Sequence, residues 1–338
     1  MTERDRRIAT FLDAAGWGQA VRETLAGDAS FRRYDRLADG ACRAVLMDAP
    51  PPREDVRPFA NLARHLRHLG LSAPEIMAED NEAGLLLLED LGDHTYTRLL
   101  GNGADEKALY ALAVDVLIDL HRRPAAEVIP AGLPPYDDGR LLDEACLFTD
   151  WYMPAILGHP TTPDIRQAYV EAWSGVFSAV HAQPRTLVLR DYHVDNLMRL
   201  DGRHGLAACG LLDFQDAVAG AAAYDLVSLL EDARRDIAPD LTAAMLERYI
   251  SAFPEMDLVA FEAAYVILGA QRHAKVIGIF TRLCRRDGKP HYLVHIPRLW
   301  RLFEHALEHP VLSAVAQWVD RHVPPKSREN PPCQAAAQ

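Results

Sequence analysis

The sequence predicts an α+β fold, with a small sheet-containing lobe followed by a larger, mainly helical lobe. Two strand-like segments, 31–37 and 42–47, flank a turn at 38–40, a pattern typical of a β-hairpin whose first strand is unusually basic at Arg32, Arg33 and Arg36. Four consecutive leucines at 85–88 follow Gly84 and indicate a short buried strand. After about residue 93 apolar residues recur mostly at helical spacing, so we expect the second lobe to be helical.

The small lobe is expected to span residues 1–92 and to contain two helices besides its strands. Apolar residues at helical spacing predict these helices over 3–17 and 54–69, and Gly70 follows the second as its expected C-cap. The order helix, hairpin, helix, strand describes a compact unit in which both helices can pack on one small sheet.

The larger lobe is expected to span residues 93–323. Helical spacing recurs in the segments 107–122, 141–151, 162–181, 224–234, 241–253 and 258–284. Two strand-like segments interrupt the helices, at 186–189 and 206–212. The tail at 324–338 is polar and rich in proline, so we expect it to be mobile.

The charge balance argues against one broad class of function. The chain of 338 residues holds 36 Lys and Arg against 48 Asp and Glu, a formal net charge of −12. Binding along a phosphate backbone depends on many Lys and Arg contacts, so we expect no nucleic-acid partner. The composition, 49% hydrophobic and 25% charged, is ordinary for a globular enzyme and gives no sign of an obligate protein partner.

The sequence lacks the features of a membrane or secreted protein. No apolar run approaches the roughly 20 residues of a membrane span, and the charged start MTERDRRIAT has no secretory h-region. We therefore expect a cytoplasmic protein without a membrane partner. The five cysteines are scattered, odd in number and without a CxxC pair, which argues against a zinc ribbon and against a disulfide framework.

The strongest candidate site lies where two predicted strands end in polar residues. The strand at 187–189 leads into Asp191 and, five residues later, Asn196. A second apolar strand ends in Asp213, 17 residues beyond Asn196. Asn196 and Asp213 offer the hard oxygen ligands that suit Mg²⁺, which usually shares its coordination sphere with phosphates. Asp191 is then left to accept a proton from an alcohol nucleophile.

The spacing D-x-x-x-x-N followed by D-F-x resembles the catalytic loop and metal-binding segment of kinases. Leu189 stands where protein kinases have the His of H-R-D, and Gln215 stands where D-F-G has its Gly. With His193, these departures resemble instead the small-molecule kinases of the aminoglycoside phosphotransferase superfamily, whose loop reads roughly H-G-D-x-H-x-x-N. The segment 223–226 also resembles the helix-opening Asp of that superfamily.

This resemblance implies a bilobal protein-kinase-like fold that uses ATP and Mg²⁺. Asp191 matches the catalytic base, and Asn196 and Asp213 match the residues that hold Mg²⁺. The implied fold has a small β-containing N-lobe that binds the nucleotide and a larger, mainly helical C-lobe that binds the substrate.

Longer segments resemble one group within the superfamily more closely. Among them are GDASFRRYDRL, GLLLLEDLGDHTYTRLL, RDYHVDNLM and RHAKVIGIFTRLCRRDGKPHYL. They are similar to bacterial kinases that phosphorylate the anomeric hydroxyl of N-acetylmuramate and N-acetylglucosamine in peptidoglycan recycling. The resemblance implies an amino sugar as substrate and a sugar 1-phosphate as product.

The same resemblance implies several nucleotide-binding residues. The strand at 85–88 and the residues after it resemble the strand and hinge of kinases, whose backbone at Glu89 and Leu91 would pair with adenine. The turn at 27–31, which includes Ser30, would cover the phosphates with backbone N–H groups, as a turn nest does.

One group expected of a kinase is missing. The strand at 44–47 resembles V-A-I-K, but Met47 stands where the phosphate-binding Lys should be. Arg32 and Arg33 lie on the neighbouring strand and alternate in direction, so one of them should face the cleft and supply the charge. The helix Glu that partners such a Lys is not evident, and Glu54 is our candidate.

The sugar-binding residues are less sharply indicated. Tyr136, Glu144 and Trp151 combine apolar ring faces with a hydroxyl acceptor, although aromatic residues at helical spacing more often belong to a core. Arg272 lies mid-helix among apolar residues and would either bind the lactyl carboxylate of N-acetylmuramate or pair with a structural Asp. His193 would orient the catalytic Asp, contact the sugar or serve a structural role.

Two alternatives to an amino-sugar kinase stay open. One is a kinase for another small alcohol, such as an aminoglycoside, choline or homoserine. The other is a pseudokinase, a binding module without turnover, which only Met47 supports. The presence of Asp191, Asn196 and Asp213 favours a working kinase.

Overall fold

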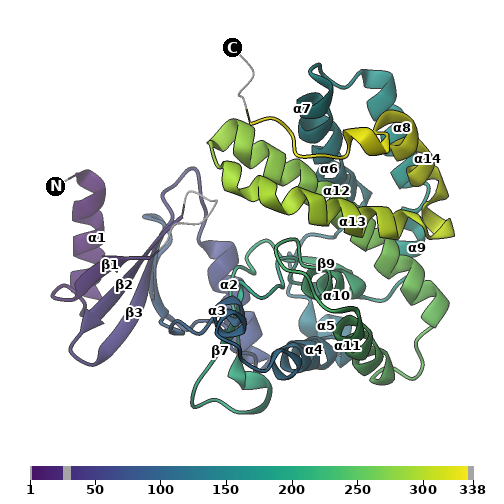
Figure 1. Cartoon of the computed structure of the whole chain (residues 1–338). Coiled ribbons are helices and arrows are strands. Elements are labelled where there is room, and N and C mark those ends of the chain that lie inside the picture. The colour runs from purple at the N-terminus through teal and green to yellow at the C-terminus, as the bar shows by residue number, and fades with distance from the viewer. Residues whose placement is uncertain (1, 26–31, 334–338) are drawn as a thin grey trace. The chain divides into compact units, whose positions relative to one another are not determined.

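The computed structural model describes residues 2–25 and 32–333, and Figure 1 shows the chain as a cartoon. Its residues group into two compact units. The first comprises Met1–Val116 and Val194–Asp216, and the second comprises Leu117–His193 and Ala217–Gln338. Within the described residues, no helix combines the length and the apolar character needed to cross a membrane.

The sheet of the first unit has five antiparallel strands in the order β1-β2-β3-β5-β4. They are β1 (Val21–Thr24), β2 (Arg33–Asp39), β3 (Cys42–Asp48), β4 (Ile76–Asp80) and β5 (Leu85–Glu89). The predicted hairpin is confirmed as β2 and β3, which pair from Arg33↔Asp48 to Asp39↔Cys42. Gly40 turns the chain with a φ of +57°, a left-handed conformation that glycine adopts without steric cost.

The two faces of this sheet differ, because side chains alternate along each strand. One face packs against α1 (Glu3–Ala14), which lies beside the sheet in Figure 1. Their shared core consists of Ile8, Leu12, Leu37, Ala44, Leu46, Ala83, Leu85 and Leu87. The opposite face carries Tyr34, Arg36, Val45 and Leu88, which line a cavity.

The first unit also takes up a later segment of the chain. Besides α2 (Arg57–His68), α3 (Tyr96–Gly101) and the first part of α4 (Glu106–Arg122), it contains the paired strands β7 (Leu197–Arg199) and β8 (Cys209–Leu211). The N–H of Leu211 donates to the carbonyl of Ser72 at 2.9 Å, and that of Arg199 to the carbonyl of His94 at 2.8 Å. These backbone bonds explain why 194–216 group with the N-terminal part, a connection that linear periodicity does not reveal.

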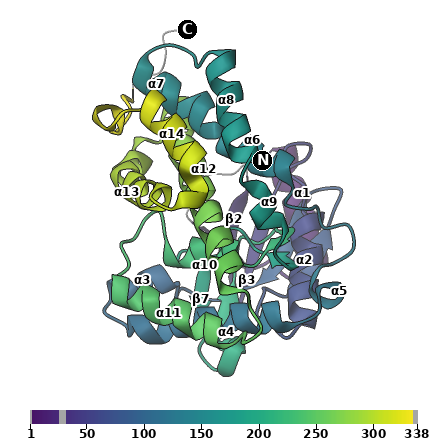
Figure 2. The same cartoon turned by 90° about the vertical axis from the view of Figure 1, so that its right-hand side faces the viewer.

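The second unit is mainly helical, with one strand pair, β6 (Arg185–Val188) and β9 (Val218–Ala221). Its helices include α5 (Ala125–Val128), α6 (Asp138–Ala145), α7 (Met153–Leu157), α8 (Pro163–Ser174), α9 (Phe177–His181), α10 (Ala223–Leu230), α11 (Pro239–Ser251), α12 (Leu258–Asp287), α13 (Ile296–Leu307) and α14 (Ser313–His322). Helix α12 has 30 residues, and α13 runs beside it (Figures 1 and 2). An N-terminal sheet followed by a mostly helical part confirms the predicted α+β class.

Two of the long predicted helices are interrupted. The segment 141–151 forms the end of α6 and then a π-helical turn, Phe148–Tyr152. The segment 162–181 divides into α8 and α9 near Gly175. Apolar residues keep their helical spacing across both breaks, so periodicity alone cannot reveal them. Strand β1 could not be predicted from apolar periodicity either, because all four of its residues are exposed.

The C-terminal tail is held by side chains as far as the structure describes it. Arg328 pairs with carboxylates of α13 and α14 at 2.7 and 2.5 Å, and its guanidinium lies 5.3 Å from the ring of Trp300. A disulfide joins Cys333 to Cys284 on α12, across 49 residues of sequence. The contacts of Arg328 differ from the mobile tail that the sequence predicts, and the scattered cysteines gave no sign of the Cys284–Cys333 disulfide. They depend on which distant residues folding brings together, and composition carries no such information.

Candidate active site

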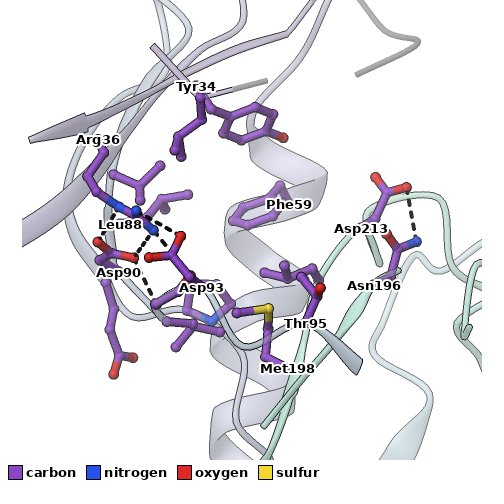
Figure 3. Close-up of a pocket in the computed structure, with 17 residues that line it drawn as sticks. Tyr34, Arg36, Phe59, Leu88, Asp90, Asp93, Thr95, Asn196, Met198 and Asp213 are labelled. Carbon is purple, nitrogen blue, oxygen red and sulfur yellow. Dashed lines mark hydrogen bonds and ion pairs between the residues drawn. The ribbon is translucent and has the colours of Figure 1, made fainter. Parts of the chain in front are cut away.

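A cavity of about 400 Å³ lies in the first unit, on the sheet face opposite α1 (Figure 3). Its walls include the apolar side chains of Leu25, Val45, Phe59, Leu88, Met198 and Leu212. In Figure 3, Arg36, Asp90 and Asp93 gather on one side of it, and Asn196 and Asp213 lie on the other. A mostly apolar cavity with a few polar groups at its ends is the usual form of a small-molecule site.

The segment after β5 forms one wall of this cavity, and Arg36 holds that segment in place. The guanidinium pairs with Asp90 at 2.7 Å and Asp93 at 2.9 Å, and donates to the carbonyl of Gly92 at 3.1 Å. Asp90 also accepts the N–H of Gly92 at 2.9 Å. The residues predicted as a hinge thus form a turn after β5, and Arg36 of β2 holds this turn in place.

The backbone of this segment offers hydrogen bonds mainly at Leu91. The N–H of Glu89 donates to the carbonyl of Glu75 at 2.9 Å, so the sheet edge already uses it. Leu91 lines the cavity, and its backbone groups make no hydrogen bond to another described residue. Adenine pairing at Glu89 is therefore limited to its carbonyl, whereas Leu91 presents both a donor and an acceptor.

Asn196 and Asp213 lie together on the other side of the cavity (Figure 3). The amide Nδ2 of Asn196 donates to Asp213 Oδ2 at 3.4 Å, and Gln215 Nε2 donates to Asp213 Oδ1 at 2.8 Å. The backbone fixes the pair as well, because the N–H of Leu212 donates to the carbonyl of Asn196 at 3.0 Å. Asp213 has a φ of +55°, an uncommon conformation for a residue other than glycine.

The donor atoms at this side of the cavity fit Mg²⁺. A carboxylate and an amide oxygen are hard ligands, and Mg²⁺ usually takes one or two such groups while keeping waters and substrate phosphates. The 3.4 Å bond between the two side chains is long for a hydrogen bond. The described part of the chain contains no group of three or more His, Cys, Asp or Glu side chains suited to a metal ion. Phosphate and water would therefore complete the coordination.

Arg32 and Arg33 point in opposite directions. The Arg32 guanidinium pairs with Glu54 at 3.0 Å and lies 3.8 Å from Asp213, and its side chain is 12% exposed. Arg33 is 66% exposed and pairs with Asp48 at 3.1 Å. The alternation of side chains along an extended segment produces this difference. Of the two arginines, Arg32 is the one beside the Asp213 carboxylate.

Met47, at the position of the missing Lys, is buried in β3 and 1% exposed. Its register partners are Tyr34 on β2 and Leu86 on β5. An uncharged thioether fills this part of the sheet, so Met47 supplies no positive charge for phosphates. Ser30 and the predicted turn at 27–31 lie outside the described residues.

Asp191 belongs to the second unit and follows β6 in a turn that α10 holds. The buried Asp225 carboxylate accepts the N–H of Leu189 at 2.7 Å and that of Arg190 at 2.8 Å. Arg190 has a left-handed φ of +69°, and the N–H of Asp191 donates to the carbonyl of Leu189 at 2.9 Å. Burial raises the pKa of Asp225 to about 7, against the effect of the two N–H bonds. Asp225 thus fixes the backbone that presents Asp191.

Positive charge around Asp191 favours its ionised form. Burial alone would raise the pKa of Asp191, but Lys275, His193, Arg190 and Arg272 together hold it below its ordinary value. Among these, Lys275 has the strongest effect. Lys275 and Arg272 are themselves 7% and 4% exposed, so little water screens them. A carboxylate kept ionised in this way can accept a proton.

Two of these cations pair with the Glu144 carboxylate. Its Oε1 contacts Lys275 Nζ at 3.0 Å and the guanidinium of Arg190. Its Oε2 accepts from the hydroxyl of Tyr136 and from Gln271 Nε2 at 3.3 Å. A carboxylate accepts about four hydrogen bonds, so no acceptor position of Glu144 is left for a sugar hydroxyl. This differs from the role in sugar binding that the sequence predicts.

The other residues predicted to bind sugar divide into two groups. The first group, Tyr136, Arg272 and His193, lies around Asp191. The Tyr136 ring lies 5.9 Å from the guanidinium of Arg190, the residue before Asp191. Arg272 and His193 both lower the pKa of Asp191. Burial lowers the pKa of His193, although the carboxylates of Asp232 and Asp191 oppose that shift. Trp151 lies in the π-helical turn, Phe148–Tyr152, that follows α6.

Sequence reasoning missed Lys275 and Arg36. Lys275 ends a polar run, Gln271 to Lys275, inside a long apolar helix, and all three of Gln271, Arg272 and Lys275 are buried. That run is the signal, because charged residues are almost never fully buried unless they are paired. Arg36 lies four residues after Arg32, at the spacing that places both on the same face of the strand.

Known proteins resemble this chain along nearly its whole length. Residues 21–259 match the model of the phosphotransferase enzyme family. The chain is 39% identical to an N-acetylmuramate/N-acetylglucosamine kinase of Caulobacter vibrioides, over 97% of this chain and 99% of the relative. It is 40% identical to the protein of the same name from Pseudomonas aeruginosa, over 90% of this chain and 89% of the relative.

Solved structures agree with the predicted protein-kinase-like fold. A choline/ethanolamine kinase family protein from Mesorhizobium loti superposes with a TM-score of 0.61 at 16% identity, over 94% of this chain and 99% of that one. The GDP complex of an aminoglycoside 2'-phosphotransferase gives a TM-score of 0.60 at 13% identity, over 90% and 99%. Fold, family match and relatives lead to one conclusion: the chain belongs to the phosphotransferase enzyme family.

Proposed function

We propose that this protein is an ATP-dependent kinase that phosphorylates N-acetylmuramate and N-acetylglucosamine on the anomeric hydroxyl. The observation that carries the proposal is the 39% and 40% identity, over most of both chains, to kinases named for these two sugars. The anomeric position and the choice of ATP come from the resemblance of the sequence motifs. The product would be the sugar 1-phosphate.

The nucleotide is proposed to bind in the cavity of the first unit. Its apolar walls suit a purine ring, and the free backbone groups of Leu91 suit the edge of adenine. Arg32 would supply positive charge to the phosphates in place of a Lys. Mg²⁺, held by Asp213 and Asn196, would neutralise charge on the β- and γ-phosphates.

Asp191 is proposed to act as the general base. Its ionised carboxylate would accept the proton of the anomeric hydroxyl while that oxygen forms its bond to the γ-phosphorus. The bond between the γ-phosphorus and the bridging oxygen breaks, and ADP leaves with the electron pair. The anomeric hydroxyl is more acidic than an ordinary alcohol, so its deprotonation needs less assistance from the base. Phosphoryl transfer otherwise depends on positioning and charge stabilisation.

The anomeric assignment predicts that methyl glycosides are not phosphorylated. A methyl group on the anomeric oxygen removes the nucleophile, while the ring and acetamido group remain free to bind. We expect ATP turnover with N-acetylglucosamine and N-acetylmuramate, and none with their methyl glycosides. Coupled ADP release measures the turnover, and phosphorus NMR identifies the phosphorylated oxygen. Phosphorylation of a methyl glycoside at a rate close to that of the free sugar would rule out the anomeric position.

The proposed role of Arg32 predicts a change in nucleotide affinity. Replacing Arg32 with Met should raise the KM for ATP about tenfold or more, because a hydrogen bond to a charged group is worth about 1.5–3 kcal/mol. The KM for the sugar should barely change. Arg33→Met is the matched control, since Arg33 faces Asp48 on the other side of the strand. Equal KM values for ATP in the two variants would mean that the phosphates find their charge elsewhere.

A further inference from the structure

Arg36 binds the turn after β5 through all three nitrogens of its guanidinium, and the proposed chemistry gives this side chain no role. Its Nε contacts Asp90 at 2.7 Å, and its Nη1 contacts Asp93 at 2.9 Å (Figure 3). Its Nη2 donates to Asp90 Oδ1 and to the carbonyl of Gly92, each at 3.1 Å. One side chain of β2 therefore holds three residues of a four-residue segment.

The pair between Arg36 and Asp90 is the stronger part of this arrangement. The side chain of Asp90 is 7% exposed and that of Arg36 is 21% exposed, so water screens their attraction little. Asp93 is 55% exposed, and an exposed pair contributes less. Asp90 also accepts the N–H of Gly92 at 2.9 Å, which closes a tight turn across the residue between them.

Leu91 is the residue that this turn presents to the cavity. It lines the cavity, and its backbone N–H and carbonyl make no hydrogen bond within the part of the chain that the structure describes. Both of its neighbours are bonded, because Asp90 and Gly92 contact Arg36 and each other. The backbone of Leu91 is thus fixed from both sides, while its own donor and acceptor stay available to a ligand.

A fixed N–H at this place distinguishes between the two common purines. The N1 atom of adenine accepts a hydrogen bond, whereas N1 of guanine carries a hydrogen and donates one. The N–H of Leu91 would therefore match adenine and oppose guanine. The distinction depends on rigidity, because a loose turn would adapt to either base and would have to be ordered on binding.

We propose that Arg36 is a positioning residue for the nucleotide base: by holding the turn after β5 it fixes the N–H of Leu91, and so makes the cavity selective for adenine over guanine. This inference rests on the proposed function, in which the nucleotide binds in this cavity. Arg36 acts on the base through the turn, whereas the phosphates would be met by Arg32 and Mg²⁺. Its role therefore concerns nucleotide affinity and base choice.

The test measures the Kd of ATP and of GTP, each as its Mg²⁺ complex, by isothermal titration calorimetry without sugar. Arg36→Met should weaken ATP binding about tenfold, as expected for the loss of one or two neutral hydrogen bonds, and should leave GTP binding nearly unchanged. Asp90→Asn should weaken ATP binding in the same selective way. Its amide oxygen can still accept the N–H of Gly92, but it forms no ion pair with Arg36.

The double variant, Arg36→Met with Asp90→Asn, separates positioning from folding. Arg36→Met alone leaves the Asp90 carboxylate buried without its main partner, so its melting temperature should fall. Removing that charge as well should restore part of the melting temperature. The Kd of the double variant for ATP should stay raised but be no higher than in Arg36→Met, because both changes remove one interaction.

Arg22→Met is the matched control. Arg22 forms another arginine–aspartate pair on the same sheet, with Asp35, and neither of these residues lines the cavity. The variant should bind ATP and GTP as the wild-type protein does. Loss of ATP affinity in this control would show that nucleotide binding responds to any weakening of the sheet, and the specific role of Arg36 would be lost.

Four further results would overturn the proposal. Equal affinity of the wild-type protein for ATP and GTP would remove the selectivity itself. Equal losses for both nucleotides in Arg36→Met would mean that Arg36 supports the cavity as a whole. Wild-type ATP affinity in Arg36→Met would show that the turn holds its shape alone. A loss in Arg36→Met without one in Asp90→Asn would mean that Arg36 contacts the nucleotide directly.

The proposed sugar kinase activity is tested apart from these constants. Turnover of ATP with N-acetylmuramate and N-acetylglucosamine in the wild-type protein decides it, and the binding measurements contain no sugar. Absent turnover with selective ATP binding would therefore count against the proposed substrate and leave the role of Arg36 in place. Normal turnover with unselective binding would count against the role of Arg36 alone.

Discussion

Replacing Asp191 with Asn is expected to lower kcat by a factor on the order of 10²–10⁴, the usual contribution of a general base or acid. The amide keeps the size of the side chain but cannot take up the proton of the hydroxyl at neutral pH. The loop should keep its shape, because Asp225 binds the backbone N–H groups of Leu189 and Arg190 rather than the side chain. The KM for the sugar should therefore change far less than kcat, and steady-state kinetics measure both.

Asp195→Asn is the control for this experiment. Asp195 lies in the same loop, and its carboxylate accepts a hydrogen bond from the hydroxyl of Thr97. We expect this variant to retain most of its turnover. Wild-type turnover in Asp191→Asn would remove Asp191 from the mechanism. Equal losses in the two variants would instead indicate a general disturbance of the loop.

Replacing Asp213 with Ala is expected to abolish turnover at ordinary Mg²⁺ concentrations. The variant loses the one charged group of the proposed metal site, and even residues that only support a metal ligand cost about 10–100-fold when changed. The Mg²⁺ concentration for half-maximal activity should rise by more than that. Asn196→Ala should raise it less, because a neutral amide oxygen is a weaker ligand than a carboxylate.

A titration of activity against Mg²⁺, at saturating ATP and sugar, measures this order. Asp216→Ala is the matched control, since Asp216 carries the same charge three residues after Asp213 and does not line the cavity. It should leave the Mg²⁺ requirement where it is. If neither Asp213→Ala nor Asn196→Ala shifts that requirement, the two residues do not hold the metal.

Much of the fold is visible in the sequence because its signals are local. The β2–β3 hairpin follows from two strand-like segments around the turn at Gly40, and β5 follows from four leucines in a row. Strand β1 gives no such signal, because its side chains are all exposed. The break between α8 and α9 gives no signal in the sequence, since apolar residues keep their helical spacing through it.

The site is predictable only where it depends on spacing along the chain. Asn196 and Asp213 come together because Asn196 directly precedes β7 and Asp213 follows β8, and the two strands pair. The partners of Glu144 could not be predicted in this way. Lys275 reaches it from a helix more than a hundred residues later in the sequence, and no linear pattern records that contact.

The proposed exchange of an amine for the Arg32 guanidinium beside the cavity affects which chemical reagents could label the proposed nucleotide site. Met47 occupies the strand position of the usual Lys, and the chain has no lysine at all before Lys107. Burial would lower the pKa of Arg32, but Tyr34 and Glu54 hold it above its ordinary value, so its guanidinium stays protonated. Nucleotide analogues that label kinases by acylating an amine near the phosphates thus meet no lysine on this sheet. Arginine-directed dicarbonyl reagents, used with and without nucleotide, are the chemistry that this cavity admits.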